Sequence, residues 1–210
     1  MCSSDLDRDY YYNTSCIELA KKVNQALIRI KQKDFDKIHE VYSLIKALKI
    51  DENNIKVLLD LETLSSNENE IEKIYNDLVK IIPLFKNIII AGNSVPNTTA
   101  NIMRNTSKDI IRLEWSLYQS LKEIGLILDF ADYSVRHHES IGYENNFIPK
   151  VDVKLYYTTE NGFLIFRGEQ FNAKGKDGAK SIIPICQTIS KFNDFSKDYS
   201  YGDKKIYEIA

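Results

Sequence analysis

Val57-Leu58-Leu59-Asp60-Leu61-Glu62 and Ile88-Ile89-Ile90-Ala91-Gly92-Asn93 are apolar runs that each end on acidic or amide residues. Leu126-Ile127-Leu128-Asp129 and Phe163-Leu164-Ile165-Phe166-Arg167 end on a charge in the same way. This pattern is typical of buried parallel strands whose carboxyl ends open into a polar site. Ligands of α/β proteins collect at that edge of the sheet, so the residues that end these runs are the candidates for function.

Helical patterns alternate with the apolar runs. One is expected from an N-cap at Asp34 through Leu48, a second from Asn67 to Pro83, and a third from Asp109 to Gly125. The expected strands lie at residues 26–30, 55–61, 87–91 and 126–130. This alternation predicts a parallel sheet with right-handed crossovers.

A β-hairpin is expected near the end of the chain, because Asn161-Gly162 separates two strand-like runs at residues 152–159 and 163–167. A last helix is expected at residues 179–191. The fold predicted from all these elements is an α/β partial TIM-like (β/α) barrel with a β-hairpin insertion. The alternative is an open doubly wound α/β sheet, which accepts the same insertion.

The composition limits the classes of protein. The 210 residues are 43% hydrophobic and 28% charged, with a formal net charge of -2, which argues against a global attraction to nucleic acid or membrane. No apolar run approaches the roughly 18 residues that span a bilayer, and no signal peptide is visible, so we expect a soluble cytoplasmic protein. Nucleic-acid binding would depend on a small loop cluster of Lys174, Lys176 and Lys180 near Phe171.

Cysteine and histidine give no metal or disulfide framework. Cys2, Cys16 and Cys186 are widely spaced, so we expect reduced thiols. The histidines are His39 in a helical pattern and the adjacent pair His137 and His138, whose side chains diverge in most backbone conformations. No metal site is predicted, and the sequence identifies no cofactor.

The two ends suggest a gene fragment. Met1-Cys2-Ser3-Ser4-Asp5-Leu6 reads like the translation of a sequencing adapter, which suggests a metagenomic origin and a true start upstream of Asp7. The last residues, 204–210, look like the first turns of a helix. We therefore expect residues 7–210 to form a single, incomplete α/β domain.

Four segments in one order resemble the phage and bacterial "beta protein" family. They are Ile111-Arg112-Leu113-Glu114-Trp115, Leu128-Asp129-Phe130-Ala131-Asp132-Tyr133, Tyr156-Tyr157-Thr158 with Leu164-Ile165-Phe166-Arg167-Gly168, and Tyr199-Ser200-Tyr201-Gly202-Asp203-Lys204-Lys205-Ile206. Each piece alone is weak, and their order makes the resemblance specific. It covers residues 20 to 210 and implies a fragment that lacks an upstream part and a histidine-rich end.

The resemblance also shows departures. Phe130-Ala131-Asp132 stands where the family has Gly-Asp, and Tyr201 stands where a tryptophan is usual. The resemblance implies an origin in phages, prophages or bacteria and a role in phage–host conflict, without an established biochemical activity. It matches Arg112, Glu114, Asp129, Asp132, Arg167 and Asp203, whereas Asp60, Glu62 and Asn93 are candidates by position alone.

Two functions from different classes fit these candidates. In one, the chain is part of a hydrolase-like enzyme: the carboxylates Asp60, Glu114, Asp129 and Asp132 act as general acid and base or hold a divalent cation, and Arg112, Arg167, Asn93 and Asp203 bind an anionic substrate. In the other, it is a non-catalytic module for a protein partner or small anionic ligand, and the charges form ion pairs that orient the strands. Carboxylates converging in a cleft would favour the enzyme, whereas acids that are all paired would favour the module.

Overall fold

The structure is a computed structural model that describes residues 10–133, 151–159, 162–171 and 178–210. The chain divides into two compact units, the first formed by Met1–Val95 with Arg112–His138 and the second by Pro96–Ile111 with Glu139–Ala210. The prediction of one incomplete domain over residues 7–210 stays a prediction. The pair His137 and His138 and the lysines Lys174 and Lys176 lie outside the described residues.

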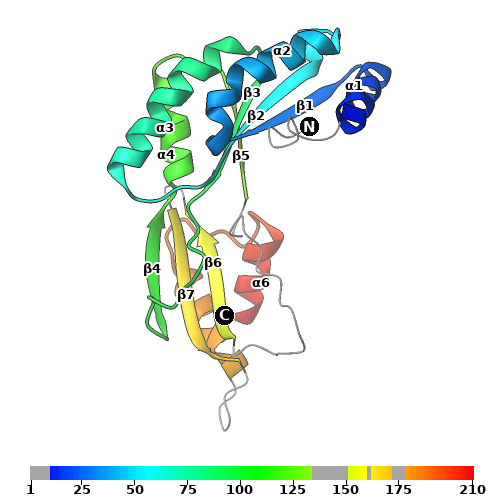
Figure 1. Cartoon of the computed structure of the whole chain (residues 1–210). Coiled ribbons are helices and arrows are strands. Elements are labelled where there is room, and N and C mark those ends of the chain that lie inside the picture. The colour runs from blue at the N-terminus through cyan, green and yellow to red at the C-terminus, as the bar shows by residue number, and fades with distance from the viewer. Residues whose placement is uncertain (1–9, 134–150, 160–161, 172–177) are drawn as a thin grey trace. The chain divides into compact units, whose positions relative to one another are not determined.

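The first unit carries a parallel sheet of four strands in the order β1-β2-β3-β5 (Figure 1). Its elements in chain order are α1 (Tyr10–Val23), β1 (Ala26–Lys31), η2 (Gln32–Lys37), α2 (Ile38–Leu48), η3 (Glu52–Asn54), β2 (Ile55–Thr63), α3 (Glu68–Ile81), η4 (Ile82–Leu84), β3 (Ile88–Asn93), α4 (Leu113–Glu123) and β5 (Asp129–Asp132). The expected alternation of strand and helix is therefore confirmed.

The sheet is not closed, and a TIM-like barrel is not confirmed. Strand order follows chain order without reversal, so the four strands show no switch point of the kind that defines a doubly wound sheet. Right-handed crossovers between strands in this order place every connecting helix on the same face. The core agrees, because α2, α3 and α4 all contribute to one cluster with the strands, including Val41, Leu78 and Leu121.

Strand alternation sorts the side chains of this sheet onto two faces. Ile28, Leu59 and Ile90 point into the helical core, whereas Arg29 and Asp60 point to the other face, which we call the open face. Burying an apolar side chain such as that of Ile28, Leu59 or Ile90 contributes about 1.5–3 kcal/mol. The open face carries the charged residues of β1 and β2.

Several boundaries differ from the prediction. Asp34 does not cap a helix: it lies inside the 3-10 turn η2, and α2 begins only at Ile38. The segment expected to start a helix at Asp109 is instead strand β4 (Thr106–Ile111), because it pairs with a strand that is distant in sequence. The fourth parallel strand begins at Asp129 instead of ending at residue 130. The helix start at Asn67 is confirmed, since its side chain accepts a hydrogen bond from the Asn69 amide.

The second unit is built on an antiparallel sheet in the order β4-β7-β6. Its elements are β4 (Thr106–Ile111), β6 (Asp152–Thr158), β7 (Gly162–Gln170), η5 (Gly178–Ser181), α5 (Ile182–Ile189) and α6 (Tyr201–Ile209). The hairpin of β6 and β7 is confirmed by their antiparallel pairing. Its core joins Phe166 of β7 to Cys186, Ile189 and Ile206 of the two helices.

Candidate functional site

The carboxyl ends of β1, β2, β3 and β5 form one edge of the parallel sheet. Lys31, Asp60, Ala91 and Ala131 are in register across the four strands, so their side chains share the open face. The polar residues predicted from the ends of the runs gather at this edge in two clusters. One lies on the open face, and the other lies on the helical side.

The open-face cluster consists of Arg29, Asp60 and Tyr133. The Arg29 Nε donates to Asp60 Oδ2 at 2.6 Å, the Tyr133 hydroxyl donates to the same oxygen at 2.6 Å, and Arg29 Nη2 donates to the Tyr133 hydroxyl at 3.1 Å. Arg29 Nη2 also forms an ion pair with Asp60 Oδ2. Between β2 and β5, β3 presents only Ala91 in this row, and its small side chain leaves room for Tyr133 to reach across.

Asp60 is almost fully buried, with 1% of its side chain exposed, yet its charge is fully compensated. Its second oxygen accepts the backbone amide of Glu62 at 2.9 Å, which holds Glu62 at a φ of 54°. Beside this turn, Lys31 Nζ contacts Glu62 Oε1 at 2.6 Å. A buried carboxylate is stable only when such partners replace water, and here an arginine, a phenol and a backbone amide do so.

The cluster raises the pKa of two of its members. Burial raises the pKa of Tyr133, and its hydrogen bond to Asp60 adds to the effect, bringing the pKa to about 12. Burial lowers the pKa of Arg29, but the hydrogen bond and charge of Asp60 outweigh it and raise the pKa. The cluster therefore holds a neutral phenol and a cationic guanidinium around one carboxylate.

The helical-side cluster consists of Ser94, Glu114, Arg112 and Asp132. The Ser94 hydroxyl donates to Glu114 Oε2 and accepts the backbone amide of Leu113 at 3.0 Å. Arg112 donates to Glu114 Oε1 at 3.3 Å and to Asp132 Oδ2 at 2.8 Å, and so bridges the start of α4 to the end of β5. Only 1% of the Glu114 side chain and 12% of Arg112 are exposed.

Aromatic rings and a glycine shape this second cluster. The Arg112 guanidinium lies 5.6 Å from the ring centroid of Trp115 and 5.8 Å from that of Phe130, within the range of cation–π attraction. A Cβ on Gly92 would lie 3.0 Å from the Glu114 Cβ, which is tighter than nine in ten real Cβ contacts. Glycine at position 92 therefore allows Glu114 to approach the sheet.

Two predicted site residues of the first unit have other surroundings. Asn93 is buried, and its side chain accepts the backbone amide of Val95 at 2.9 Å, a contact that shapes the turn after β3. Asp129 is exposed at the start of β5, in register with Ile89. It therefore lies at the opposite end of this strand from Asp132, because the strand begins where it was expected to end.

Arg167 and Asp203 belong to the second unit. Arg167 Nε donates to Asp152 Oδ2 at 2.7 Å, and its Nη1 donates to the backbone carbonyls of Thr99, Ala100 and Ile102. Burial raises the pKa of Asp152, but Arg167 and Arg104 outweigh it and lower the pKa. Arg167 thus fixes the loop before β4.

Asp203 lies in the first turn of α6. Its amide donates to the Ser200 hydroxyl, which in turn donates to the Asp203 carboxylate at 2.5 Å, an N-terminal cap of the helix. Burial raises the pKa of Tyr157, and a hydrogen bond to Asp203 contributes. Arg167 and Asp203 each have a role inside the second unit, and their participation in a site with residues of the first unit stays a prediction.

The arrangement favours charge pairing over metal binding. In the part of the chain that the structure describes, no group of three histidine, cysteine or acidic residues is placed to hold a metal ion. Asp60 and Glu114 also lie on opposite faces of the sheet, since Asp60 is in register with Ala91 whereas Glu114 contacts the adjacent Gly92. They do not form a carboxylate pair.

The family model described as Beta protein matches residues 5–210. The chain belongs to the Beta protein family. No curated protein and no solved structure matches it. Within this member of the Beta protein family, the segment Ile111-Arg112-Leu113-Glu114-Trp115, one of the four that carried the resemblance, supplies two of the four residues of the helical-side cluster, Arg112 and Glu114.

Several residues of these clusters were not predicted. Arg29, Tyr133, Ser94, Gly92 and Asp152 contact the predicted acids and arginines, yet only Tyr133 stands directly beside one of them in sequence. Arg29 had one usable signal, because it alternates with Ile28 and Ile30 and so faces away from the core. None of the described helices of this Beta protein family member is long and apolar enough to cross a membrane.

Proposed function

We propose that this member of the Beta protein family is a non-catalytic interaction or ligand-sensing module of phage or bacterial origin that acts in phage–host conflict in the cytoplasm. The observation that carries the proposal is the pairing of the acids at the carboxyl edge. Asp60 is paired with Arg29, Glu62 with Lys31, and both Glu114 and Asp132 with Arg112. The charges then orient strands and loops for binding instead of performing chemistry.

The number of contacts supports this assignment. A general acid or base needs a proton that it can exchange with a substrate, and it needs reach to that substrate. The Asp60 carboxylate instead accepts bonds from Arg29, Tyr133 and the Glu62 amide, and Glu114 accepts from Ser94 and Arg112. Such acids are committed to holding the fold together.

A hydrolase-like enzyme acting on an anionic substrate is the second candidate. It is supported by the position of two nearly buried carboxylates at the carboxyl edge of a parallel sheet whose strands follow one another in order, as in part of a (β/α) barrel. In this alternative either Asp60 or Glu114, which lie on opposite faces of the sheet, acts as acid or base, and the arginine beside it binds the anion.

Isosteric amides distinguish the two candidates. The full chain and its Asp60→Asn and Glu114→Gln variants would be expressed in a bacterial host, and plaque formation would be measured with a panel of phages. Glu72→Gln, an exposed position on α3, is the matched control. Plaque formation is measured at several growth temperatures, and circular dichroism at the same temperatures establishes which variants are folded.

If the protein is a non-catalytic module, each variant protects against phages at every temperature at which it is folded. Protection is then lost only when the variant unfolds. An enzyme loses about 100-fold or more of its protection although the variant is folded, because a missing general acid or base lowers rates by that order. That second result would overturn the proposal. A wild-type chain that protects against no phage in the panel would refute the role in phage–host conflict.

A further inference from the structure

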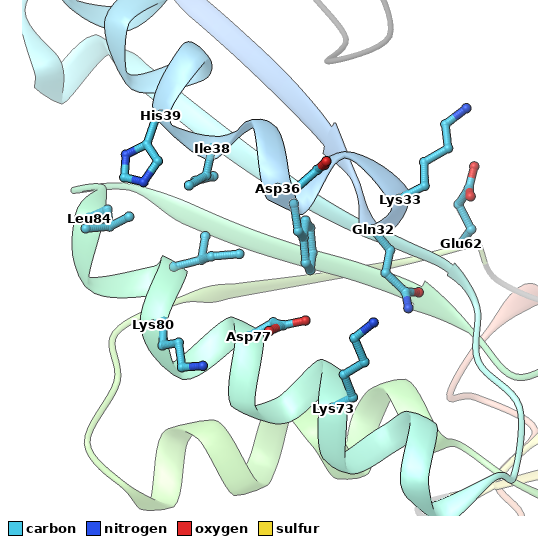
Figure 2. Close-up of a pocket in the computed structure, with 12 residues that line it drawn as sticks. Gln32, Lys33, Asp36, Ile38, His39, Glu62, Lys73, Asp77, Lys80 and Leu84 are labelled. Atoms are coloured by element: carbon cyan, nitrogen blue, oxygen red, sulfur yellow. The ribbon is translucent and has the colours of Figure 1, made fainter.

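A cleft of about 770 Å³ lies in the first unit, between η2 with the start of α2 on one side and α3 on the other (Figure 2). Ligand sites for small molecules are typically about 300–1,000 Å³. Apart from Glu62, none of the residues that line the cleft belongs to the paired network of the carboxyl edge. The inference drawn from it does not rest on the proposed function.

The floor of the cleft is apolar. Phe35, Ile38 and Ile81 line it, and each is buried in the core of the unit. These side chains belong to the hydrophobic core that η2, α2 and α3 share with the sheet, so the floor is present without a ligand. It offers a preformed apolar surface to a side chain of moderate size.

Several polar side chains at the cleft have no partner among the described residues, including Lys33, Asp36 and Lys80 and the three that follow. Gln32, Lys73 and Asp77 make no hydrogen bond or ion pair there, in contrast to the paired acids of the carboxyl edge. Figure 2 shows the Gln32 amide, the Lys73 ammonium and the Asp77 carboxylate directed toward the same part of the cleft. A cation, an anion and an amide thus converge over an apolar floor.

The spacing on α3 sets the distance between the two charges. Lys73 and Asp77 are four residues apart, so their Cβ atoms lie about 5–6 Å from each other on one face of the helix. A ligand placed between the two ends can contact both if it carries a negative and a positive group on neighbouring atoms. An α-amino acid has this arrangement.

We propose that the cleft binds a free α-amino acid with an apolar side chain. Its carboxylate accepts hydrogen bonds from the Lys73 ammonium and the Gln32 amide nitrogen, and its ammonium donates to the Asp77 carboxylate. Its side chain covers Phe35, Ile38 and Ile81. Lys33 and Lys80 also line the cleft, together with the acids Asp36 and Glu62.

Calorimetric titration of the full chain tests the proposal. L-phenylalanine and L-leucine are expected to bind, whereas glycine, N-acetyl-L-leucine and L-leucinamide, which lack the apolar body, the ammonium or the carboxylate, are expected to bind about tenfold more weakly or not at all. Asp77→Asn and Lys73→Gln should each weaken L-leucine by about tenfold or more. Glu72→Gln, the neighbouring exposed position, should leave the affinity unchanged.

Both test positions are on the surface of α3, and thermal melts of each variant check that it is folded. The proposal is overturned if neither amino acid binds the folded wild type at millimolar concentration. It is also overturned if the acetylated or amidated forms bind as well as L-leucine, or if the two α3 variants bind like the control.

Discussion

The two clusters at the carboxyl edge bury acids equally well but protect them differently. Asp60 and Glu114 are each 1% exposed, yet Arg29 beside Asp60 is 38% exposed and Arg112 beside Glu114 is 12% exposed. Among the residues that the structure describes, Asp60 also has a phenol and a backbone amide as partners, whereas Glu114 has the Ser94 hydroxyl alone besides its arginine. The ion pair between an arginine and a buried acid therefore contributes a different share of the stability of each cluster.

The largest expected effect comes from Arg112→Met. It leaves the buried Glu114 carboxylate without its cation and should lower the free energy of unfolding by about 3 kcal/mol. Arg29→Met should cost about 1 kcal/mol, because Asp60 keeps two donors and the lost ion pair is partly solvated. Urea unfolding followed by the fluorescence of Trp115, the single tryptophan, measures both values in the first unit. Equal losses in the two variants would contradict the comparison.

Arg167→Met extends the comparison to the second unit. Its guanidinium is the donor to three backbone carbonyls of the loop before β4, so its loss should cost about 2 kcal/mol locally. Hydrogen exchange followed by mass spectrometry should show faster exchange in residues 99–105 and unchanged protection in β1, β2 and β3. Arg104→Met is the control, since it removes only a contact to Asp152. Faster exchange throughout the chain would argue against two separately stabilised units.

Alkaline pH separates the open-face cluster from the helical-side one. The pKa of Tyr133 is raised from 10.0 to about 12, so its protonated form is favoured by the fold, and that stabilisation is complete below pH 10 and is lost as the pH rises toward 12. Because Tyr133 is partly exposed, solvent screening reduces the effect to about 1 kcal/mol. Urea midpoints between pH 9 and 11.5 should fall more steeply for the wild type than for Tyr133→Phe. If the urea midpoints of the wild type and Tyr133→Phe fall equally with pH, the Tyr133 phenol does not contribute to the stability of the cluster.

The smallest effect is expected at Asp129. This side chain is exposed at the beginning of β5 and has no hydrogen bond or ion pair with either cluster among the described residues, so Asp129→Asn should change the free energy of unfolding by less than about 0.5 kcal/mol. Asp132→Asn is the matched comparison on the same strand, and it should cost more because Asp132 contacts Arg112. A larger loss at Asp129 than at Asp132 would reverse the order inferred from the structure.

Local signals predicted much of the fold. The cap at Asn67, the apolar runs of β2 and β3 and the pairing of β6 with β7 depend on neighbours in sequence, and all were found. The segment after Asp109 was misread because its strand conformation depends on pairing with β7, more than fifty residues away. The hydrogen bonds between β4 and β7, which form only in the folded chain, override the local helical preference of this segment.

The candidate site was predicted in part for the same reason. The acids at the ends of strands were visible because they interrupt apolar runs, but their partners are distant: Arg29 is 31 residues from Asp60, and Tyr133 is 73 residues from it. Gly92 was included only as part of a run, since its importance depends on how closely Glu114 approaches it. A single sequence contains no signal for contacts between residues that are so far apart along the chain.

The hydrogen bond from the Leu113 amide to the Ser94 hydroxyl also bears on how this chain can change in length. It joins two residues of the first unit, Ser94 and Leu113, that lie on either side of the segment 96–111, which belongs to the second unit. The first unit is therefore held together across the point where the segment 96–111 interrupts its sequence. Doubling the length of a flexible connection costs only about 0.6 kcal/mol of loop entropy, so a longer connection before β4 should leave the parallel sheet nearly as stable.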